Sequence, residues 1–403
     1  MSAPVAFPFP SPSRYHPAPE LLELVEREPV APVELPDGRA AWLVTGYEQT
    51  RRVLTDQRFS RARAVAAAGG KGGGAVIATQ SMLGLDPPEH TRLRKLVSSA
   101  FTARRIERMR PEITAIVDDL LDSLRAGPRP ADLVSGFALP LPVQVICAML
   151  GVPKEDKDRF HAWSDALLGD WNSDQGEMAA AFDHLCAYMA ELIAAKRARP
   201  ADDLMTALIA ARDDADRLSE DELIKLGVTL LFAGHQTTAT QITMSLLTLL
   251  TDRPELDRLR SDEALVPAAV EELMRYVQLI GGGGAIALAR VTTEEVTLGS
   301  VTLPEGALVL PALPAANRDP SVFPEPNRFD VTRAPGAIHL GFGAGIHHCL
   351  GAQLARINLQ EAFRGLLFRL PGLRLAVAPE ELRFKDSVFV NGLHELPVVW
   401  DAP

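Results

Sequence analysis

The sequence predicts a mainly α-helical fold with a minor β element, organised as a single domain over residues 1–403. Apolar residues recur at helical spacing over most of the chain up to about residue 275. Strand-like alternation is confined to Val33–Val44 near one end and to Val291–Val309 and Val388–Val399 near the other. No linker or internal repeat divides the chain. Helices that share one core with a small split sheet account for this pattern.

Composition limits the classes of protein that the chain can belong to. With 47% apolar and 23% charged residues, it is long enough to bury a large core and enclose a cofactor. A formal net charge of −11 argues against a nucleic-acid partner, since such proteins gather basic residues. Met1–Pro19 is rich in proline and lacks a basic start followed by an apolar run. We therefore expect an extended segment over residues 1–20, no membrane partner and a cytoplasmic protein.

Three further elements are expected in chain order. Two short apolar runs around Pro36-Asp37-Gly38 predict a hairpin within Val33–Val44. Ala64–Val76 consists mostly of Ala and Gly, so we expect a mobile loop there, either a lid over a pocket or a disordered surface loop. Leu223–Leu250 is the longest apolar stretch, and the polar residues in its middle favour a long central helix over a membrane span.

The strongest local signal is a glycine-rich loop that leads into a helix at Cys349. It reads Gly341-Phe342-Gly343-Ala344-Gly345-Ile346-His347-His348-Cys349-Leu350-Gly351, and apolar positions at helical spacing follow from Ala352 to Leu370. Free N–H groups at a helix start stabilise a thiolate. The glycines at 343, 345 and 351 let a flat ring approach the backbone closely, and Phe342 can shield the sulfur from water. A thiolate held in this way can ligate haem iron.

Other interpretations of Cys349 compete on the residues alone. A buried cysteine at a helix start is the commoner case, and Cys147 and Cys186, which lie in apolar helical runs, are interpreted as core residues without disulfides. A zinc site or a nucleophile could use His347 and His348. Zinc requires three or four ligands at suitable spacing, and no second Cys or His group stands nearby in the sequence. The pattern around Cys349 favours the haem ligand.

The loop resembles the haem-binding signature of the cytochrome P-450 family, Phe-x-x-Gly-x-x-x-Cys-x-Gly, at Phe342, Gly345, Cys349 and Gly351. Three more family motifs occur in the expected order, so the resemblance spans roughly residues 30 to 400. It implies a cytochrome P-450 fold in which one large domain encloses one haem b, with Cys349 as the iron ligand. It also implies a monooxygenase that uses dioxygen and two delivered electrons.

A second motif, Ala233-Gly234-His235-Gln236-Thr237-Thr238, lies within the expected central helix. By the resemblance, the small residues Ala233 and Gly234 let the helix pass over the porphyrin. Thr237 is the alcohol that helps to bring protons to oxygen, and it is predicted to be catalytic together with Gln236 and Thr238 of the same segment. The family usually has Asp or Glu beside this threonine, whereas Gln236 is an amide that cannot ionise. We expect protons to arrive through Thr237 and water ordered by Gln236; alternatively, the altered segment marks oxidative ring closure or coupling.

Opposite charges three residues apart occur at Glu272 and Arg275. Alone, such a pair is usually an exposed surface bridge. The resemblance implies that this Glu-x-x-Arg pairs with a later arginine, matched by Arg328. A buried Arg–Glu–Arg cluster needs mutual hydrogen bonding to offset desolvation, so we expect these residues to be structural.

The two propionate carboxylates of a haem need cationic or hydrogen-bonding partners when they are partly buried. The resemblance assigns this role to His90, Arg94, Arg290 and His347. His90 and Arg94 are four residues apart and share a helix face, whereas Arg92 is expected to point elsewhere. The remaining predicted cofactor-binding residues are Ala233, Gly234, Phe342, Gly343, Gly345, Cys349 and Gly351.

Thr102–Arg110 concentrates arginines in an otherwise acidic chain. A solvated helix face and a docking site both remain open on these residues. The sequence contains no flavin or iron–sulfur segment, and the resemblance implies a separate ferredoxin and ferredoxin reductase as electron donors. Electron transfer should then depend strongly on salt.

The expected reaction is hydroxylation or epoxidation of a small organic, secondary-metabolite-like substrate. Two alternatives remain: oxidative cyclisation or coupling on the same scaffold, and a non-catalytic haem-thiolate sensor. A sensor would keep Cys349 but would need no alcohol in the central helix. By family analogy, the substrate faces residues 64–85, Leu230–Thr237, Gly281–Ile286 and Ser387–Asn391.

Overall fold

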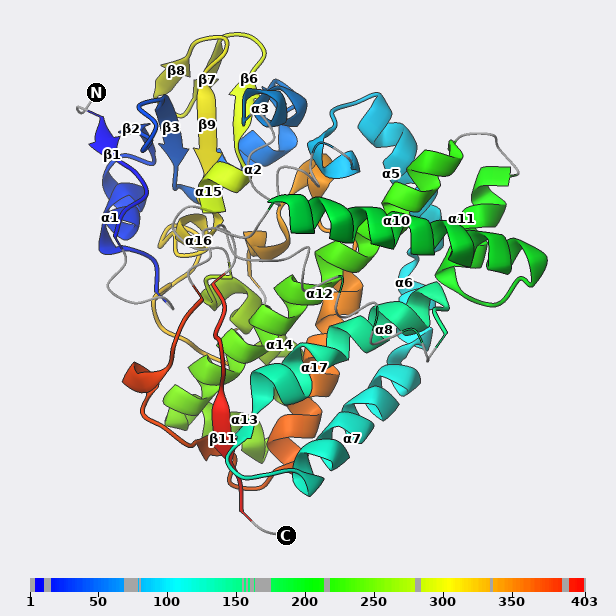
Figure 1. Ribbon diagram of the computed structural model, residues 1–403. Coiled ribbons are helices and arrows are strands. Elements are labelled where there is room, and N and C mark those ends of the chain that lie inside the picture. Colours follow the sequence, from blue (N-terminus) through cyan, green and yellow to red (C-terminus); the bar gives the residue numbers. More distant parts are fainter. Residues whose placement is uncertain are drawn as a thin grey trace.

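Strands and helices occupy different sides of the molecule. The computed structural model describes residues 4–10, 16–68, 79, 81–153, 156, 159, 163, 175–213, 218–279, 284–333, 336–385 and 391–401. Figure 1 shows the strands β1, β2, β3 and β6 to β9 gathered on one side, while the helices α7, α8 and α17 form the other. The central helix α12 lies between these parts, beside α17.

Helices make up most of the described chain, as the apolar spacing predicts. The α-helices are α1 (Pro19–Arg27), α2 (Tyr47–Thr55), α3 (Arg61–Ala68), α5 (Glu89–Ala100), α6 (Ala103–Arg108), α7 (Arg110–Ala126), α8 (Pro140–Leu150), α10 (Gln175–Ala198), α11 (Leu204–Asp213), α12 (Glu220–Thr251), α13 (Arg253–Ser261), α14 (Val266–Tyr276), α15 (Gly284–Ala287), α16 (Leu313–Ala316) and α17 (Ala352–Arg369). Single turns occur at η1 (Met82–Gly84), η2 (Val134–Ala138), η4 (Glu263–Leu265), η5 (Leu340–Phe342), η6 (Gly345–His347) and η7 (Pro379–Glu381).

The strands form a six-stranded sheet and two smaller ones. They are β1 (Val5–Ala6), β2 (Val30–Glu34), β3 (Ala40–Val44), β4 (Phe59–Ser60), β5 (Ala131–Asp132), β6 (Arg290–Thr292), β7 (Val296–Leu298), β8 (Val301–Leu303), β9 (Leu308–Pro311), β10 (Arg374–Leu375) and β11 (Pro397–Val399). The large sheet has the order β1-β2-β3-β9-β6-β4. Its parallel β3–β9 pair sets Leu43 opposite Leu310, so segments from the two ends of the chain meet, as the split strand signals predict.

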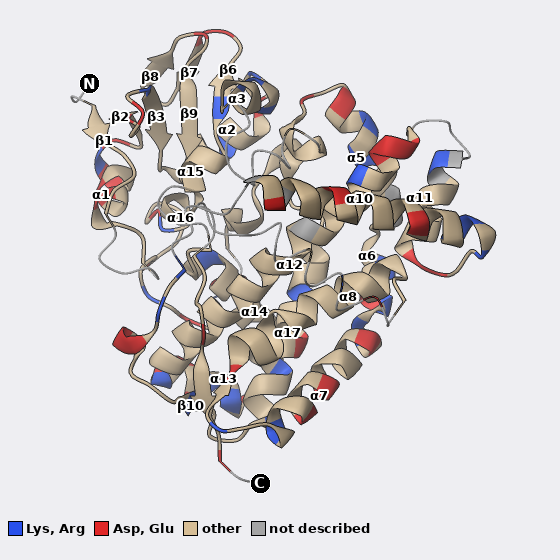
Figure 2. Ribbon diagram, in the orientation of Figure 1, with Lys and Arg blue, Asp and Glu red and all other residues tan. Residues whose placement is uncertain are grey.

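The long helix α12 confirms the prediction made from Leu223–Leu250. A capping box starts it: the Ser219 hydroxyl accepts from the Glu222 N–H at 3.1 Å, and the Glu222 carboxylate accepts from the Ser219 N–H at 2.8 Å. Beyond Lys225 the helix carries no charged residue, which Figure 2 shows as a tan ribbon. It packs against α8, α10 and α17. Among the described residues, none of the helices is both long and apolar enough to span a bilayer.

Other local expectations have mixed outcomes. The hairpin is confirmed, because β2 and β3 pair antiparallel around the predicted turn. The expected loop at Ala64–Val76 is wrong for its first five residues, which continue α3; alanine favours helix, and Ala64 and Val65 are buried. Residues 69–78 lie outside the described part. Of the strand expected at Val388–Val399, Pro397–Val399 is present.

Candidate functional site

Cys349 lies where the turn η6 leads into helix α17. Its N–H donates to the carbonyl oxygen of Phe342 at 2.9 Å. The loop folds tightly because Gly345 has a φ of +70°, and a Cβ there would collide with the carbonyl oxygen of Leu54. Any other residue at 345 would meet both strain and a clash. The loop therefore holds the sulfur in one place at the start of α17.

The sulfur lies in a recess of the protein rather than on its outer surface. Cys349 is accessible to solvent, yet protein surrounds it closely enough that burial raises the pKa of its thiol. Three features oppose this rise in pKa: the N–H of Gly351 and the positive charges of Arg94 and Arg356. Because a metal ion displaces the proton from a coordinating thiol and the proton is released, the raised pKa would not prevent ligation. Neither of the other two cysteines forms a disulfide with a described residue; Cys147 is buried as expected, whereas Cys186 is partly buried.

Five basic side chains meet beside the cysteine loop, and we call them the cation pocket: Arg61, His90, Arg94, Arg290 and His347. Four of them are the predicted propionate partners. The rings of His90 and His347 have centroids 4.3 Å apart. The fifth, Arg61 at the start of α3, was missed by the sequence analysis. Its Nη1 donates to the carbonyl oxygen of Ala289 at 3.1 Å, and Nη1 of Arg290 donates to the same oxygen at 3.0 Å.

The cation pocket has more positive charge than its protein neighbours balance. Burial lowers the pKa of Arg290 to about 9 and that of Arg61 to about 10. Burial, reinforced by the surrounding cations, lowers the pKa of His347 to about 3. Among the described residues, neither these two arginines nor Arg94 has a carboxylate within ion-pair distance. The nearby Asp86 instead accepts from the Ser60 hydroxyl at 2.5 Å and from the Arg61 N–H at 2.9 Å.

The residues present fit a haem. Within the described chain, the buried atoms Nδ1 of His90 and Nε2 of His347 have no hydrogen-bond partner. Unpaired cations and orphaned ring nitrogens are what two partly buried carboxylates require. At Gly351 a Cβ would meet nothing within 4 Å, and the φ of −83° suits any residue. Protein contacts therefore do not demand glycine at 351, whereas close approach of a flat ring does.

The predicted oxygen-binding segment lies in the middle of α12. The Thr237 hydroxyl donates to the carbonyl oxygen of Ala233 at 2.7 Å, the back-bond that can bend a helix. Ala233 is exposed and Gln236 is partly exposed, whereas Thr238 is buried and lies on another face. In the described part of the chain, the Gln236 amide makes no hydrogen bond. Its amide is therefore available to water.

Gly234 has a packing role besides the one predicted for it. A Cβ on Gly234 would lie 2.6 Å from Cδ1 of Ile146 in α8. The small size of this residue therefore serves the packing of α8 against α12. That Ala233 and Gly234 also make room for the cofactor stays a prediction.

The cluster formed by Glu272, Arg275 and Arg333, which we call the Glu272 cluster, corrects the assignment of Arg328. Glu272 pairs with Arg275 at 2.7 Å and with Arg333 at 3.0 Å. The Arg328 side chain is exposed and contacts Glu325 at 3.4 Å. Its backbone carbonyl oxygen, however, accepts from Nη2 of Arg333 at 2.8 Å. Arg328 thus joins the cluster by its backbone, because the loop turns its side chain toward solvent.

In two basic segments, the direction in which each arginine points decides whether it forms an ion pair within the described chain. On α5, Arg92 forms an ion pair with Glu222 of α12, so it points away from the cation pocket as expected. In Thr102–Arg110, Arg105 pairs with Asp202 and Arg110 with Glu107 and Glu361. Arg104 and Arg108 are exposed and make no ion pair with any described residue. These two arginines are the part of the segment that is open to a partner.

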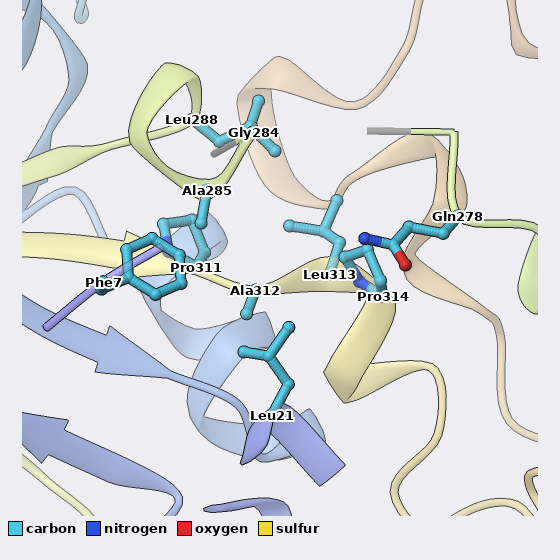
Figure 3. Close-up of a pocket in the computed structure, with 10 residues that line it drawn as sticks. All are labelled: Phe7, Leu21, Gln278, Gly284, Ala285, Leu288, Pro311, Ala312, Leu313 and Pro314. Carbon is cyan, nitrogen blue, oxygen red and sulfur yellow. The ribbon is translucent and has the colours of Figure 1, made fainter. Parts of the chain in front are cut away.

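Parts of the expected substrate wall lie outside the described residues, namely 69–78, 80, 281–283 and 387–390. A small pocket of about 20 Å³ lies between Phe7, α15 and α16, as Figure 3 shows, with Gln278 on its opposite side. It has room for about one water molecule, so it does not hold an organic substrate. Among the described residues, no three His, Cys, Asp or Glu side chains gather as metal ligands.

Comparisons with known proteins agree with this geometry. The family model described as Cytochrome P450 matches residues 143–370. The chain is 48% identical to mycinamicin IV hydroxylase/epoxidase of Micromonospora griseorubida, over 94% of each chain. It is 46% identical to nocardicin C N-oxygenase of Nocardia uniformis subsp. tsuyamanensis, over 98% of each. The solved structure of the LnmA cytochrome P450 hydroxylase from the leinamycin pathway of Streptomyces atroolivaceus S-140 matches with a TM-score of 0.89 and 42% identity, over 98% of this chain and 100% of that one.

Proposed function

This chain belongs to the cytochrome P450 family, and from that premise we propose that it inserts one oxygen atom of dioxygen into a small secondary-metabolite-like substrate by hydroxylation or epoxidation. It is a monooxygenase that binds haem b. One substrate, one dioxygen, two electrons and two protons give one oxygenated product and one water. The relatives support oxygen insertion, since their names describe a hydroxylase/epoxidase and an N-oxygenase.

The observation that carries the proposal is a recessed thiol beside a pocket of unpaired cations. Bound haem supplies the binding and reductive activation of dioxygen. Cys349 ligates the iron, and the cation pocket holds the two carboxylates in a fixed orientation. These residues would hold the haem in one orientation, and the haem would supply the oxygen chemistry there.

Proton delivery falls to the middle of α12. The Thr237 hydroxyl gives its hydrogen to Ala233, so its oxygen lone pairs are free to accept a hydrogen bond from water. The Gln236 amide can hold that water through either its oxygen or its NH₂ group. Gln236→Glu places an ionisable group there, and product formed per reductant consumed should change. An unchanged ratio contradicts this role for Gln236.

A separate ferredoxin with its reductase supplies the electrons, and all three proteins act in the cytoplasm. Arg104 and Arg108 are the exposed, unpaired arginines that an acidic partner would contact, whereas Arg105 and Arg110 are engaged within the chain. The double change Arg104→Gln and Arg108→Gln should slow electron transfer at low salt and flatten its salt dependence. Rates that do not respond to salt in the unchanged protein contradict the proposal.

The decisive experiment has two parts. Purified protein, reduced and exposed to carbon monoxide, should show the long-wavelength absorption of thiolate-ligated ferrous haem. Compounds that shift the ferric spectrum should then be turned over with a surrogate ferredoxin and ¹⁸O-labelled dioxygen. Label in the product supports oxygen insertion. Product without label indicates cyclisation or coupling, the alternative that Gln236 leaves open, and a spectral shift without product indicates a sensor.

A further inference from the structure

A second charged cluster lies behind the cysteine loop, formed by Glu271 of α14, His339 and Arg356 of α17; we call it the Glu271 cluster. Nε of Arg356 donates to one Glu271 carboxylate oxygen at 2.6 Å, and Nη2 donates to the other at 3.0 Å. Nε2 of His339 lies 3.1 Å from the second oxygen. Such a two-pronged pair fixes the orientation of both side chains. None of these three residues belongs to the motifs on which the family resemblance rests.

The histidine connects this pair to the loop. Nδ1 of His339 accepts the N–H of Gly341 at 3.1 Å. A backbone N–H can only donate, so in the neutral ring the proton sits on Nε2 and is donated to Glu271. Hydrogen bonds from His339 and Arg356 lower the pKa of Glu271 to about 2 against the opposing effect of burial. Glu271 therefore stays ionised and anchors the start of the loop to α14.

The Glu271 cluster acts on the cysteine loop in two ways, through contacts with the Phe342 ring and through the charge of Arg356. The guanidinium of Arg356 lies 4.6 Å from the ring centroid of Phe342, whose carbonyl oxygen accepts the N–H of Cys349. The ring of His339 borders the same phenyl ring at a centroid distance of 5.8 Å. Arg356 is also one of the two cations that act on the Cys349 thiol. Its charge is balanced by Glu271, whereas that of Arg94, the other cation, is not balanced by any described carboxylate.

We propose that Glu271 and Arg356, linked to the loop by His339, are positioning residues that fix Phe342 beside the sulfur and keep Cys349 a strong electron donor by neutralising the nearby cation. The proposal rests on the haem-thiolate function. An unpaired cation at Arg356 would draw electron density from the thiolate, and an unpaired carboxylate at Glu271 would push density toward it. Charge balance, rather than either charge alone, sets the donor strength.

Two charge deletions test the proposal, because they should act in opposite directions. Glu271→Gln leaves Arg356 unbalanced and should raise the ferric–ferrous midpoint potential of the loaded protein. Arg356→Gln leaves Glu271 unbalanced and should lower it. Each change should alter the ferric–ferrous equilibrium by roughly three- to tenfold, the order expected for one charge near a partly buried group. The absorption maxima of the two carbon monoxide complexes should also move in opposite directions.

Arg364→Gln is the matched control. Arg364 lies on the same helix and pairs with Glu361 at 2.7 Å and with Glu263 at 3.2 Å, and among the described residues it makes no hydrogen bond or ion pair with the loop that carries Cys349. It should leave the potential unchanged. Arg356→Lys keeps the charge but loses the two-pronged geometry; its potential should stay near that of the unchanged protein, while its carbon monoxide complex should convert faster to the form without thiolate.

Shifts of the same sign for the two deletions, or shifts no larger than that of Arg364→Gln, overturn the proposal. If Glu271→Gln does not fold, the comparison of Arg356→Gln with Arg356→Lys decides alone, since only the first removes charge. Failure of the haem-thiolate function is recognised separately. In that case the unchanged protein itself lacks the thiolate carbon monoxide spectrum.

Discussion

The cation pocket and the Glu272 cluster hold buried arginines under opposite conditions. Arg275 and Arg333 share one carboxylate, and Arg275 also donates to the carbonyl oxygens of Asn317 and Pro326, each at 2.8 Å. Arg290 is equally buried, but its Nη1 reaches only the carbonyl oxygens of Leu288 and Ala289. In the Glu272 cluster the positive charges are balanced by a carboxylate of the protein. In the cation pocket they are balanced only when an anion binds.

This difference distinguishes charged residues that hold the fold together from charged residues that bind a ligand. A buried cation without a carboxylate costs free energy in the empty protein, and that cost is recovered when carboxylates arrive. A paired cluster gains nothing from a ligand and instead holds segments of the chain together. The Glu272 cluster joins α14 to the loop before the cysteine segment, so removing its charges should destabilise the fold. Removing charge from the cation pocket should weaken cofactor binding.

The largest effect is expected from Glu272→Gln. The change leaves Arg275 and Arg333 buried around a neutral amide, and the free energy of unfolding should fall by about 3–5 kcal/mol. Urea unfolding of the haem-loaded protein measures the loss. Glu325→Gln, an exposed carboxylate that pairs with Arg328, is the control and should change little. A loss below about 1 kcal/mol for Glu272→Gln contradicts a structural role for the cluster.

A smaller effect distinguishes the two candidate third members of the Glu272 cluster. Arg333→Leu removes hydrogen bonds to a buried carboxylate, so it should cost about 2 kcal/mol. Arg328→Leu removes an exposed side chain and should cost less than about 0.5 kcal/mol. The same urea titration compares them. If the two changes lowered the free energy of unfolding equally, Arg328 would be the third member of the cluster, as the sequence motif predicted.

Arg61→Gln tests the cation pocket. The informative result is that the change should weaken haem binding without lowering the stability of the haem-free protein. Loss of one cation should speed the transfer of haem to an acceptor protein by about fivefold, equivalent to about 1 kcal/mol. In haem-free protein the same change should not lower stability, since it removes an uncompensated buried charge. Arg63→Gln is the control, because Arg63 lies on the same helix and pairs with Glu305 at the surface. If Arg61→Gln lowered the stability of the haem-free protein, Arg61 would be a residue that stabilises the fold.

The last effect is a change of stability with pH, which is expected from His347. Its pKa in the folded haem-free protein is about 3, below its ordinary value of 6.5, because burial and nearby cations disfavour the charged ring. Between these values the unfolded chain binds a proton that the folded chain does not. Stability should therefore fall as pH is lowered from 6.5 toward 3, by about 1 kcal/mol per pH unit for this group. His347→Asn should flatten the slope in urea titrations at pH 6.5 and 5.0, and bound haem should flatten it too, since its carboxylates favour the charged ring.

The sequence by itself determined the features that depend on local pattern. Spacing of apolar residues predicted α12 and α17, and turn residues predicted the hairpin at Val33–Val44. The glycine-rich loop predicted Cys349 as the haem ligand, since glycines, cysteine and helix start are contiguous in the chain. The offset of four residues on α5 predicted that Arg92 points away from the face shared by His90 and Arg94.

Only the tertiary structure decided which distant charges meet. Arg61 and Arg290 are far apart in sequence, and no local pattern marks the first as a member of the cation pocket. The direction of a loop determines that Arg333, and not Arg328, pairs with Glu272, and the periodicity of the sequence does not encode this direction. Likewise, only the fold shows that Gly234 packs against Ile146 and that Glu271 pairs with Arg356. Side-chain direction in loops and contacts between distant segments depend on the packing of the whole chain, so a motif can name a residue type without naming its partner.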